Sequence, residues 1–124
     1  ALVVAPTSVG PNWLAEAKRF APSLNMIPYR GVARELYLDA LEPGDVLVTS
    51  YEILVRDLDE LAACEFATLV LDEAQAVKNA STQRWRAASR LRADWVLALT
   101  GTPIENHAGD AFALLSLLCP GILG

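Results

Sequence analysis

A chain of 124 residues with 53% hydrophobic and 20% charged residues can bury one core, but it is too short for two domains. No apolar run reaches the roughly 18 residues of a transmembrane helix, so we expect no membrane partner. The net charge of −5 argues against a general nucleic-acid coat, and a single histidine argues against a zinc site. We interpret Cys64 and Cys119 as small buried hydrophobes in a reducing cytoplasm.

Five apolar runs alternate with segments of helical spacing. The runs cover residues 1–6, 25–29, 45–50, 68–72 and 95–101, and the helical segments cover residues 11–20, 33–41, 52–63, 81–91 and 108–118. The runs are continuous rather than alternating, which is typical of strands buried on both faces. Pro11 is placed to open the first helix, whose apolar stripe contains Trp13 and Phe20, and Ser81 is placed to cap the fourth. The alternation predicts an α/β fold, an open parallel sheet with helices on both faces.

Four of these runs end in short segments rich in hydroxyls or carboxylates. These segments are Pro6-Thr7-Ser8, Thr49-Ser50-Tyr51, Asp72-Glu73 and Thr100-Gly101-Thr102. Ligands bind beyond the carboxyl ends of the strands in such sheets, so we expect these segments to form one functional edge. Ordinary polarity at the ends of strands remains the alternative.

Asp72 and Glu73 are the strongest candidates for chemistry. Their side chains point in different directions, so one can hold a metal while the other addresses a nucleophilic water. Magnesium commonly takes one or two carboxylates together with substrate phosphates, and this suits nucleotide hydrolysis. The structural alternative is a strand that ends where a helix N-terminus favours negative charge.

The sequence between residues 78 and 92 is strongly basic. It contains Lys78, Arg84, Arg86, Arg90 and Arg92 and no acidic residue. A solvated helix face explains the arginines, and contact with DNA or a partner is the alternative.

Four ordered segments carry a family resemblance: "LVVAPTSVGPNWLAEAKRFAP", "DVLVTSYE", "LVLDEAQAVKN" and "LALTGTPIEN". Their order and spacing resemble the first RecA-like lobe of Swi/Snf-type ATPases, which are helicase-like translocases on double-stranded DNA found in chromatin remodellers and bacterial relatives. The resemblance implies that residues 1–124 are part of an N-terminal RecA-like helicase ATP-binding lobe. ATP and Mg²⁺ would be its cofactors, and double-stranded DNA and a second RecA-like lobe would be its partners.

The resemblance also assigns roles to the residues of these segments. Asp72 would hold magnesium, Glu73 would orient or activate the attacking water, and Gln75 would link nucleotide state to the rest of the lobe. Thr100, Gly101 and Thr102 would couple hydrolysis to lobe movement. The residues that would touch a DNA strand are Pro6, Thr7, Ser8, Thr49, Ser50 and Tyr51. Lys78 and Asn79 would extend the acidic motif and brace the lobe, with a solvated, capped turn as the alternative.

One departure from the family is large, because the sequence contains no G-x-x-x-x-G-K-[ST] loop. The family carries that loop on a strand upstream of "LVVAP", so we expect a lobe fragment that lacks its P-loop strand and is inactive alone. The unpaired edges left by that strand would invite self-association. A non-catalytic binding scaffold and another superfamily-two helicase-like motor remain alternatives. The Ala/Leu/Arg-rich composition suggests the cytoplasm or nucleoid of a bacterium.

Overall fold

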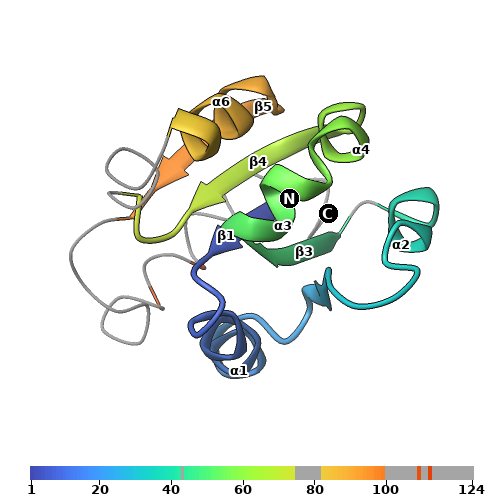
Figure 1. The fold of residues 1–124 in the computed structure, drawn as a ribbon. Coiled ribbons are helices and arrows are strands. Elements are labelled where there is room, and N and C mark those ends of the chain that lie inside the picture. Colours follow the sequence, from blue (N-terminus) through green and yellow to red (C-terminus); the bar gives the residue numbers. More distant parts are fainter. Residues whose placement is uncertain (43, 75–81, 100–108, 110–111, 113–124) are drawn as a thin grey trace.

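The computed structural model describes residues 1–42, 44–74, 82–99, 109 and 112 (Figure 1). A five-stranded sheet has the order β2-β3-β1-β4-β5, and every pair of neighbouring strands is parallel. The strands are β1 (Leu2–Ala5), β2 (Asn25–Pro28), β3 (Asp45–Ser50), β4 (Glu65–Leu71) and β5 (Arg92–Ala98). The described helices are α1 (Gly10–Phe20), α2 (Leu36–Asp39), α3 (Tyr51–Arg56), α4 (Leu58–Ala62) and α6 (Thr82–Arg90). The predicted α/β fold is confirmed.

The central strand β1 divides the core into two layers. Val3 and Ala5 belong to the cluster that contains Trp13 of α1, whereas Leu2 and Val4 belong to the cluster that contains residues of α3, α4 and α6. Successive side chains of a strand point to opposite faces, so four consecutive apolar residues can serve both layers. All four are 0% exposed. The expected helices on both faces of the sheet are therefore present.

Two predicted helices differ from the observed ones. The segment 52–63 is divided at Asp57, whose carboxylate accepts hydrogen bonds from Arg34 and Tyr29. The segment 33–41 is helical only over α2, because Ala33 has a positive φ of 60°, which a right-handed helix excludes. The first difference lies in the connection between β3 and β4, and the second lies in the connection between β2 and β3.

Three expectations of burial are wrong in part. Phe20 of the predicted apolar stripe is 44% exposed at the end of α1. Trp95 and Val96 of β5 are 57% and 61% exposed, so this strand is not covered on both faces. Cys64 is only half-buried, and burial raises the pKa of its thiol.

Some predictions lie outside the described residues. These concern Gln75, Lys78, Asn79, Ser81, Thr100, Gly101, Thr102 and Cys119. Within the expected last helix only Gly109 and Phe112 are described, and both are helical. Among the described residues, no helix is long and apolar enough to cross a membrane.

Candidate functional site

The sheet order places the ends of the polar segments side by side. β3, β1, β4 and β5 are consecutive neighbours in the parallel sheet, so their carboxyl ends share one edge. β1 leads into Pro6 and Thr7, β3 ends at Ser50, and β4 leads into Asp72. The described stretch that continues β5 ends at Leu99, directly before Thr100. This edge is where open α/β sheets bind their ligands.

Asp72 is buried at the end of β4 and is 1% exposed. Its Oδ2 accepts a hydrogen bond of 2.8 Å from Nε1 of Trp13, and its Oδ1 accepts one of 2.8 Å from the backbone N–H of Glu73. A buried carboxylate without such donors would be strongly destabilising. Trp13 is itself fixed, since it is 0% exposed and its ring meets that of Phe112 edge-on at 5.6 Å. The carboxylate of Asp72 is thus held in one orientation.

Glu73 has a left-handed backbone, with a φ of 53°. A residue with a side chain rarely adopts this conformation, and such residues gather at functional sites. The neighbouring backbone supports it, because the N–H of Ala74 donates to the carbonyl of Leu99 at 2.9 Å and the N–H of Leu99 donates to that of Leu71 at 2.9 Å. These two bonds link the acidic segment to the chain that enters Thr100. No sequence pattern indicated the strained conformation.

The second polar segment uses its side chains within the fold. Thr49 donates its hydroxyl to the carbonyl of Tyr29 at 3.0 Å, and the Ser50 hydroxyl caps α3 by accepting from the N–H of Ile53 at 3.2 Å. Tyr51 is 1% exposed and donates its hydroxyl to the carbonyl of Asp72 at 2.6 Å. Burial, with the charge of Asp72, raises the pKa of Tyr51, which therefore stays a neutral donor. These side chains organise the edge, and their contact with DNA stays a prediction.

The first polar segment is more open to solvent. Thr7 and Ser8 are exposed, and Thr7 donates its hydroxyl to Oε2 of Glu52 at 3.1 Å. The other oxygen of Glu52 accepts from Nη2 of Arg84 at 3.1 Å. The guanidinium of Arg84 also lies 5.5 Å from the ring centroid of Tyr51, which is a cation–π distance.

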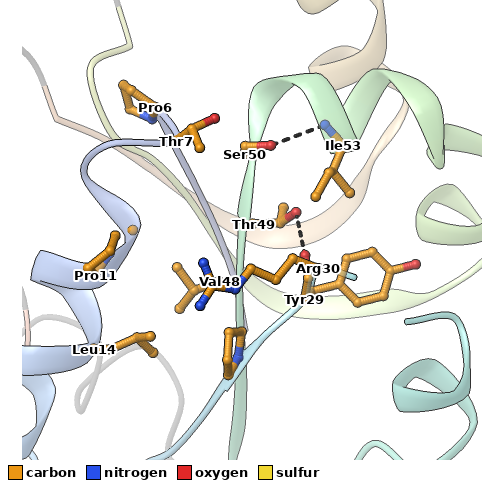
Figure 2. Close-up of a pocket in the computed structure, with 12 residues that line it drawn as sticks. Pro6, Thr7, Pro11, Leu14, Tyr29, Arg30, Val48, Thr49, Ser50 and Ile53 are labelled. Carbon is orange, nitrogen blue, oxygen red and sulfur yellow. Dashed lines mark hydrogen bonds between the residues drawn. The ribbon is translucent and has the colours of Figure 1, made fainter. Parts of the chain in front are cut away.

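A pocket lies beside this segment, between the ends of β1, β2 and β3 (Figure 2). Its volume is about 160 Å³, and its walls include Pro11, Leu14 and Val48. The expected DNA-contact residues Pro6, Thr7, Thr49 and Ser50 also line it. Arg30 lines the pocket as well, is exposed, and forms no hydrogen bond or ion pair within the described part of the chain. Arg30 is not among the predicted site residues, although its place directly after the second apolar run marks it as a residue of this edge.

The wall formed by Tyr29 is held by an ion pair behind it. Arg34 binds Asp57 through two hydrogen bonds, from Nε at 2.6 Å and from Nη2 at 2.8 Å, and the Tyr29 hydroxyl donates to the same carboxylate at 2.9 Å. Arg34 thereby lowers the pKa of Asp57, whereas burial and the bond to Asp57 raise the pKa of Tyr29. The Arg34–Asp57 ion pair and the hydrogen bond from Tyr29 together fix the backbone next to Arg30.

The described residues contain no group of three or more His, Cys, Asp or Glu side chains that could hold a metal. Asp72 and Glu73 are the adjacent acidic residues at this edge, whereas the carboxylate of Glu52 is occupied by Thr7 and Arg84. Gln75, Lys78, Asn79, Thr100, Gly101 and Thr102 cannot be placed relative to them, because they lie outside the described residues.

Comparison with known proteins gives a consistent family. A family model described as the SNF2-related domain matches residues 1–124. The chain is 37% identical to the "Chromatin-remodeling ATPase INO80" of Candida albicans, over 98% of this chain and 10% of the relative. It is 36% identical to the "Lymphoid-specific helicase" of Homo sapiens, over 98% and 16% respectively. It is 37% identical to the "Putative ATP-dependent helicase/translocase YwqA" of Bacillus subtilis, over 99% and 14%.

Solved structures agree with these relatives. The "Sulfolobus solfataricus SWI2/SNF2 ATPase core in complex with dsDNA" matches with a TM-score of 0.69 and 36% identity, over 98% of this chain and 25% of that one. The "Sulfolobus solfataricus SWI2/SNF2 ATPase core domain" matches with a TM-score of 0.66 and 37% identity, over 100% of this chain and 25% of that one. The chain thus spans only 10% to 16% of these curated relatives and a quarter of the solved cores. With a family match over its whole length, this chain belongs to the SNF2-related domain family.

Proposed function

We propose that the protein carrying this domain hydrolyses ATP and couples the hydrolysis to movement along double-stranded DNA, as a Swi/Snf-type motor. Residues 1–124 would be part of its first RecA-like lobe. The observation that carries the proposal is the acidic pair, a buried Asp72 at the carboxyl end of β4 followed by a left-handed Glu73. It lies in a chain that is 36% identical to a SWI2/SNF2 ATPase core described in complex with dsDNA.

The acidic pair is better suited to Mg²⁺ than to a metal ion whose ligands all come from the protein. Magnesium commonly uses one or two carboxylates and completes its shell with water and substrate phosphates. Asp72 would hold the ion, directly or through water, with its carboxylate oriented by Trp13 and by the N–H of Glu73. When bound, Mg²⁺ supplies positive charge that offsets the charge developing on the β- and γ-phosphates.

Glu73 would orient or activate the attacking water. Its backbone conformation differs from that of Asp72, so the two adjacent carboxylates can serve different partners. Gln75 would report nucleotide state to the lobe, and Lys78 and Asn79 would brace the segment. Thr100, Gly101 and Thr102 would couple hydrolysis to lobe movement, a role supported by the hydrogen bond between Ala74 and Leu99 immediately before them.

DNA would lie across the ends of β1, β2 and β3. The exposed Thr7 and Ser8, beside Pro6, are suited to phosphate contacts that position a strand without reading its sequence. Thr49, Ser50 and Tyr51 would shape this surface from below, because their side chains are hydrogen-bonded within the fold. Arg30 supplies a cation for phosphate at the same place, which an acidic domain needs locally.

The remaining parts of the proposal concern the whole protein. A second RecA-like lobe would complete the motor, and a P-loop on another segment would hold the ATP phosphates. The 124-residue chain alone would be inactive, and it would self-associate through its exposed sheet edge. The Ala/Leu/Arg-rich composition would place the protein in the cytoplasm or nucleoid of a bacterial cell.

ATP turnover by the full-length protein, with and without double-stranded DNA, tests this function. We expect DNA to stimulate turnover and Glu73→Gln to reduce it by roughly 10²-fold or more, the range for loss of a positioned acid–base group. Glu65→Gln is the matched control, because Glu65 is an exposed carboxylate at the opposite end of β4. Binding of DNA without any turnover would establish a scaffold instead. Undiminished turnover in Glu73→Gln would remove the acidic pair from the chemistry.

A further inference from the structure

A continuous set of contacts joins the exposed first polar segment to the acidic pair. Thr7 donates to Glu52, Glu52 is paired with Arg84, and Arg84 lies over the ring of Tyr51. Tyr51 in turn donates its hydroxyl to the carbonyl of Asp72 at 2.6 Å. The Glu52–Arg84 pair is thus the only charged link in this route between the described surface at Thr7 and the described acidic pair.

Within the described part of the chain, the Arg84 pair differs from the two other ion pairs formed by arginines of residues 84–92. The Arg84 pair is 3.1 Å long, with Arg84 26% and Glu52 56% exposed, whereas the Arg90 and Arg92 pairs are 3.5 and 3.7 Å long with both partners more exposed. Exposed ion pairs of that kind contribute little to the stability of the fold. Arg84 also contacts an aromatic ring, which fixes its guanidinium plane. Two of its partners, Glu52 and Tyr51, thus belong to different parts of the edge.

The last contact in this series, the hydrogen bond from Tyr51, is made to the peptide that precedes the strained Glu73. The carbonyl that accepts from Tyr51 belongs to the peptide that links Asp72 to Glu73, and Glu73 has the left-handed φ of 53°. Rotation of this peptide changes φ of Glu73 directly. The Tyr51 hydroxyl therefore helps to keep Glu73 in a conformation that its backbone disfavours.

We propose that Arg84 is a positioning residue that transmits DNA contact at Thr7 through the Glu52–Arg84 pair and Tyr51 to the Asp72–Glu73 peptide. This inference rests on the proposed function, because it explains how DNA would stimulate the motor. A DNA phosphate takes the hydroxyl hydrogen bond of Thr7 away from Glu52. The Glu52 carboxylate then remains paired with Arg84 without the hydrogen bond from Thr7, and the Arg84 guanidinium shifts over the Tyr51 ring. Through its hydrogen bond, the Tyr51 hydroxyl then changes the orientation of the peptide that links Asp72 to Glu73.

The charge state of the pair supports this route at neutral pH. The hydrogen bond from its own backbone N–H lowers the pKa of Glu52, the Thr7 hydroxyl and Arg84 lower it further, and burial opposes them. Glu52 is consequently a carboxylate that accepts from Thr7 and Arg84 together. A neutral glutamine at this position would keep the size of the side chain but lose the charge that ties it to Arg84.

The test is the stimulation ratio of the full-length protein, which is its ATP turnover at saturating double-stranded DNA divided by its turnover without DNA. We expect Arg84→Gln to lower this ratio about fivefold or more, the lower range of coupling between two sites. Basal turnover and the Kd for DNA are expected to stay unchanged. Arg84→Lys should restore part of the ratio, because it keeps the charge but loses the planar guanidinium over the Tyr51 ring. Arg92→Gln, the same substitution in an exposed pair, is the control.

A second variant, Glu52→Gln, tests the same link even if the Arg84→Gln protein does not fold. Glu52→Gln should lower the ratio to a similar extent, and the double variant should lose no more than either single one, because both changes break the same link. Equal losses of basal and stimulated turnover, an unchanged ratio, or a weaker Kd with a normal ratio at saturation would each overturn the route. In those cases DNA stimulation of the unsubstituted protein still supports the motor. An absence of stimulation in the unsubstituted protein overturns the motor and the route together.

Discussion

β1 and β5 both contain an apolar run, LVVA in β1 and WVLA at the end of β5, but their surroundings are opposite. Every residue of β1 is 0% exposed, whereas Trp95 and Val96 of β5 are more than half exposed. β1 has β3 and β4 as neighbours and a core layer on each face. Among the described strands, β5 has only β4 beside it. An apolar run therefore predicts a strand, but the neighbours of that strand decide whether it is buried.

Two tryptophans provide the largest expected difference between these regions. Trp13 is 0% exposed, packs on Phe112 and donates to Asp72, whereas Trp95 is 57% exposed. We expect Trp13→Ala to lower the free energy of unfolding of the purified domain by about 3–5 kcal/mol. Trp95→Ala should change it by less than about 0.5 kcal/mol. Urea unfolding measures both, and losses of equal size would show that β5 is as well covered as the centre.

Two ion pairs provide a smaller difference. Asp57 is held by Arg34 in two short hydrogen bonds near β3, whereas Glu65 and Arg92 at the start of β4 and β5 are exposed and 3.7 Å apart. We expect Asp57→Asn to cost about 1–2 kcal/mol at neutral pH. Glu65→Gln should cost less than about 0.5 kcal/mol.

The pH dependence of the same variants sharpens this comparison. Because folding lowers the pKa of Asp57, its contribution is fully present above the ordinary value of 3.8 and is lost as the pH falls through the lower folded pKa. Urea unfolding at pH 7 and in the acid range should therefore show that Asp57→Asn loses less stability on acidification than the unsubstituted domain. A parallel acid loss in both proteins would assign the pH dependence to other groups.

A substitution in the exposed strand β5 has the smallest expected effect on the free energy of unfolding. Val96→Lys places a charge on an exposed strand, so the free energy of unfolding should change by less than about 0.5 kcal/mol. The same charge should reduce self-association of the domain, because charged side chains block edge-to-edge pairing of strands. Sedimentation velocity at high protein concentration measures this. Gln83→Lys on the exposed face of α6 is the control, and a monomeric unsubstituted domain would contradict the proposed association.

Much of the fold was predictable because local patterns and the sheet agree. Continuous apolar runs gave all five strands, and Pro11 marked the start of α1. The division of the helix at Asp57 was not predictable, because it depends on Arg34 and Tyr29, which lie in a different connection. The short α2 depends on the left-handed Ala33, a conformation that the sequence does not favour at alanine.

The candidate site was predictable in its residue types but not in its connections. The placement of Asp72 and Glu73 after an apolar run indicated carboxylates at the end of a strand. No local pattern indicated that Trp13, 59 residues away, would donate to Asp72. Nor did any local pattern indicate that Glu73 would be left-handed or that Arg84 would bridge Glu52 and Tyr51.

The sequence by itself determined the alternation of strands and helices, the family, and the polar residues at the strand ends, because these depend on neighbours along the chain. The tertiary structure decided which apolar strand is covered, which hydroxyls of Thr49, Ser50 and Tyr51 serve the fold, and which arginines are paired. The physical reason is that burial and hydrogen bonding depend on distance in space. Residues 45 to 59 positions apart, such as Thr7 with Glu52 and Trp13 with Asp72, become partners only when the parallel sheet brings their elements together.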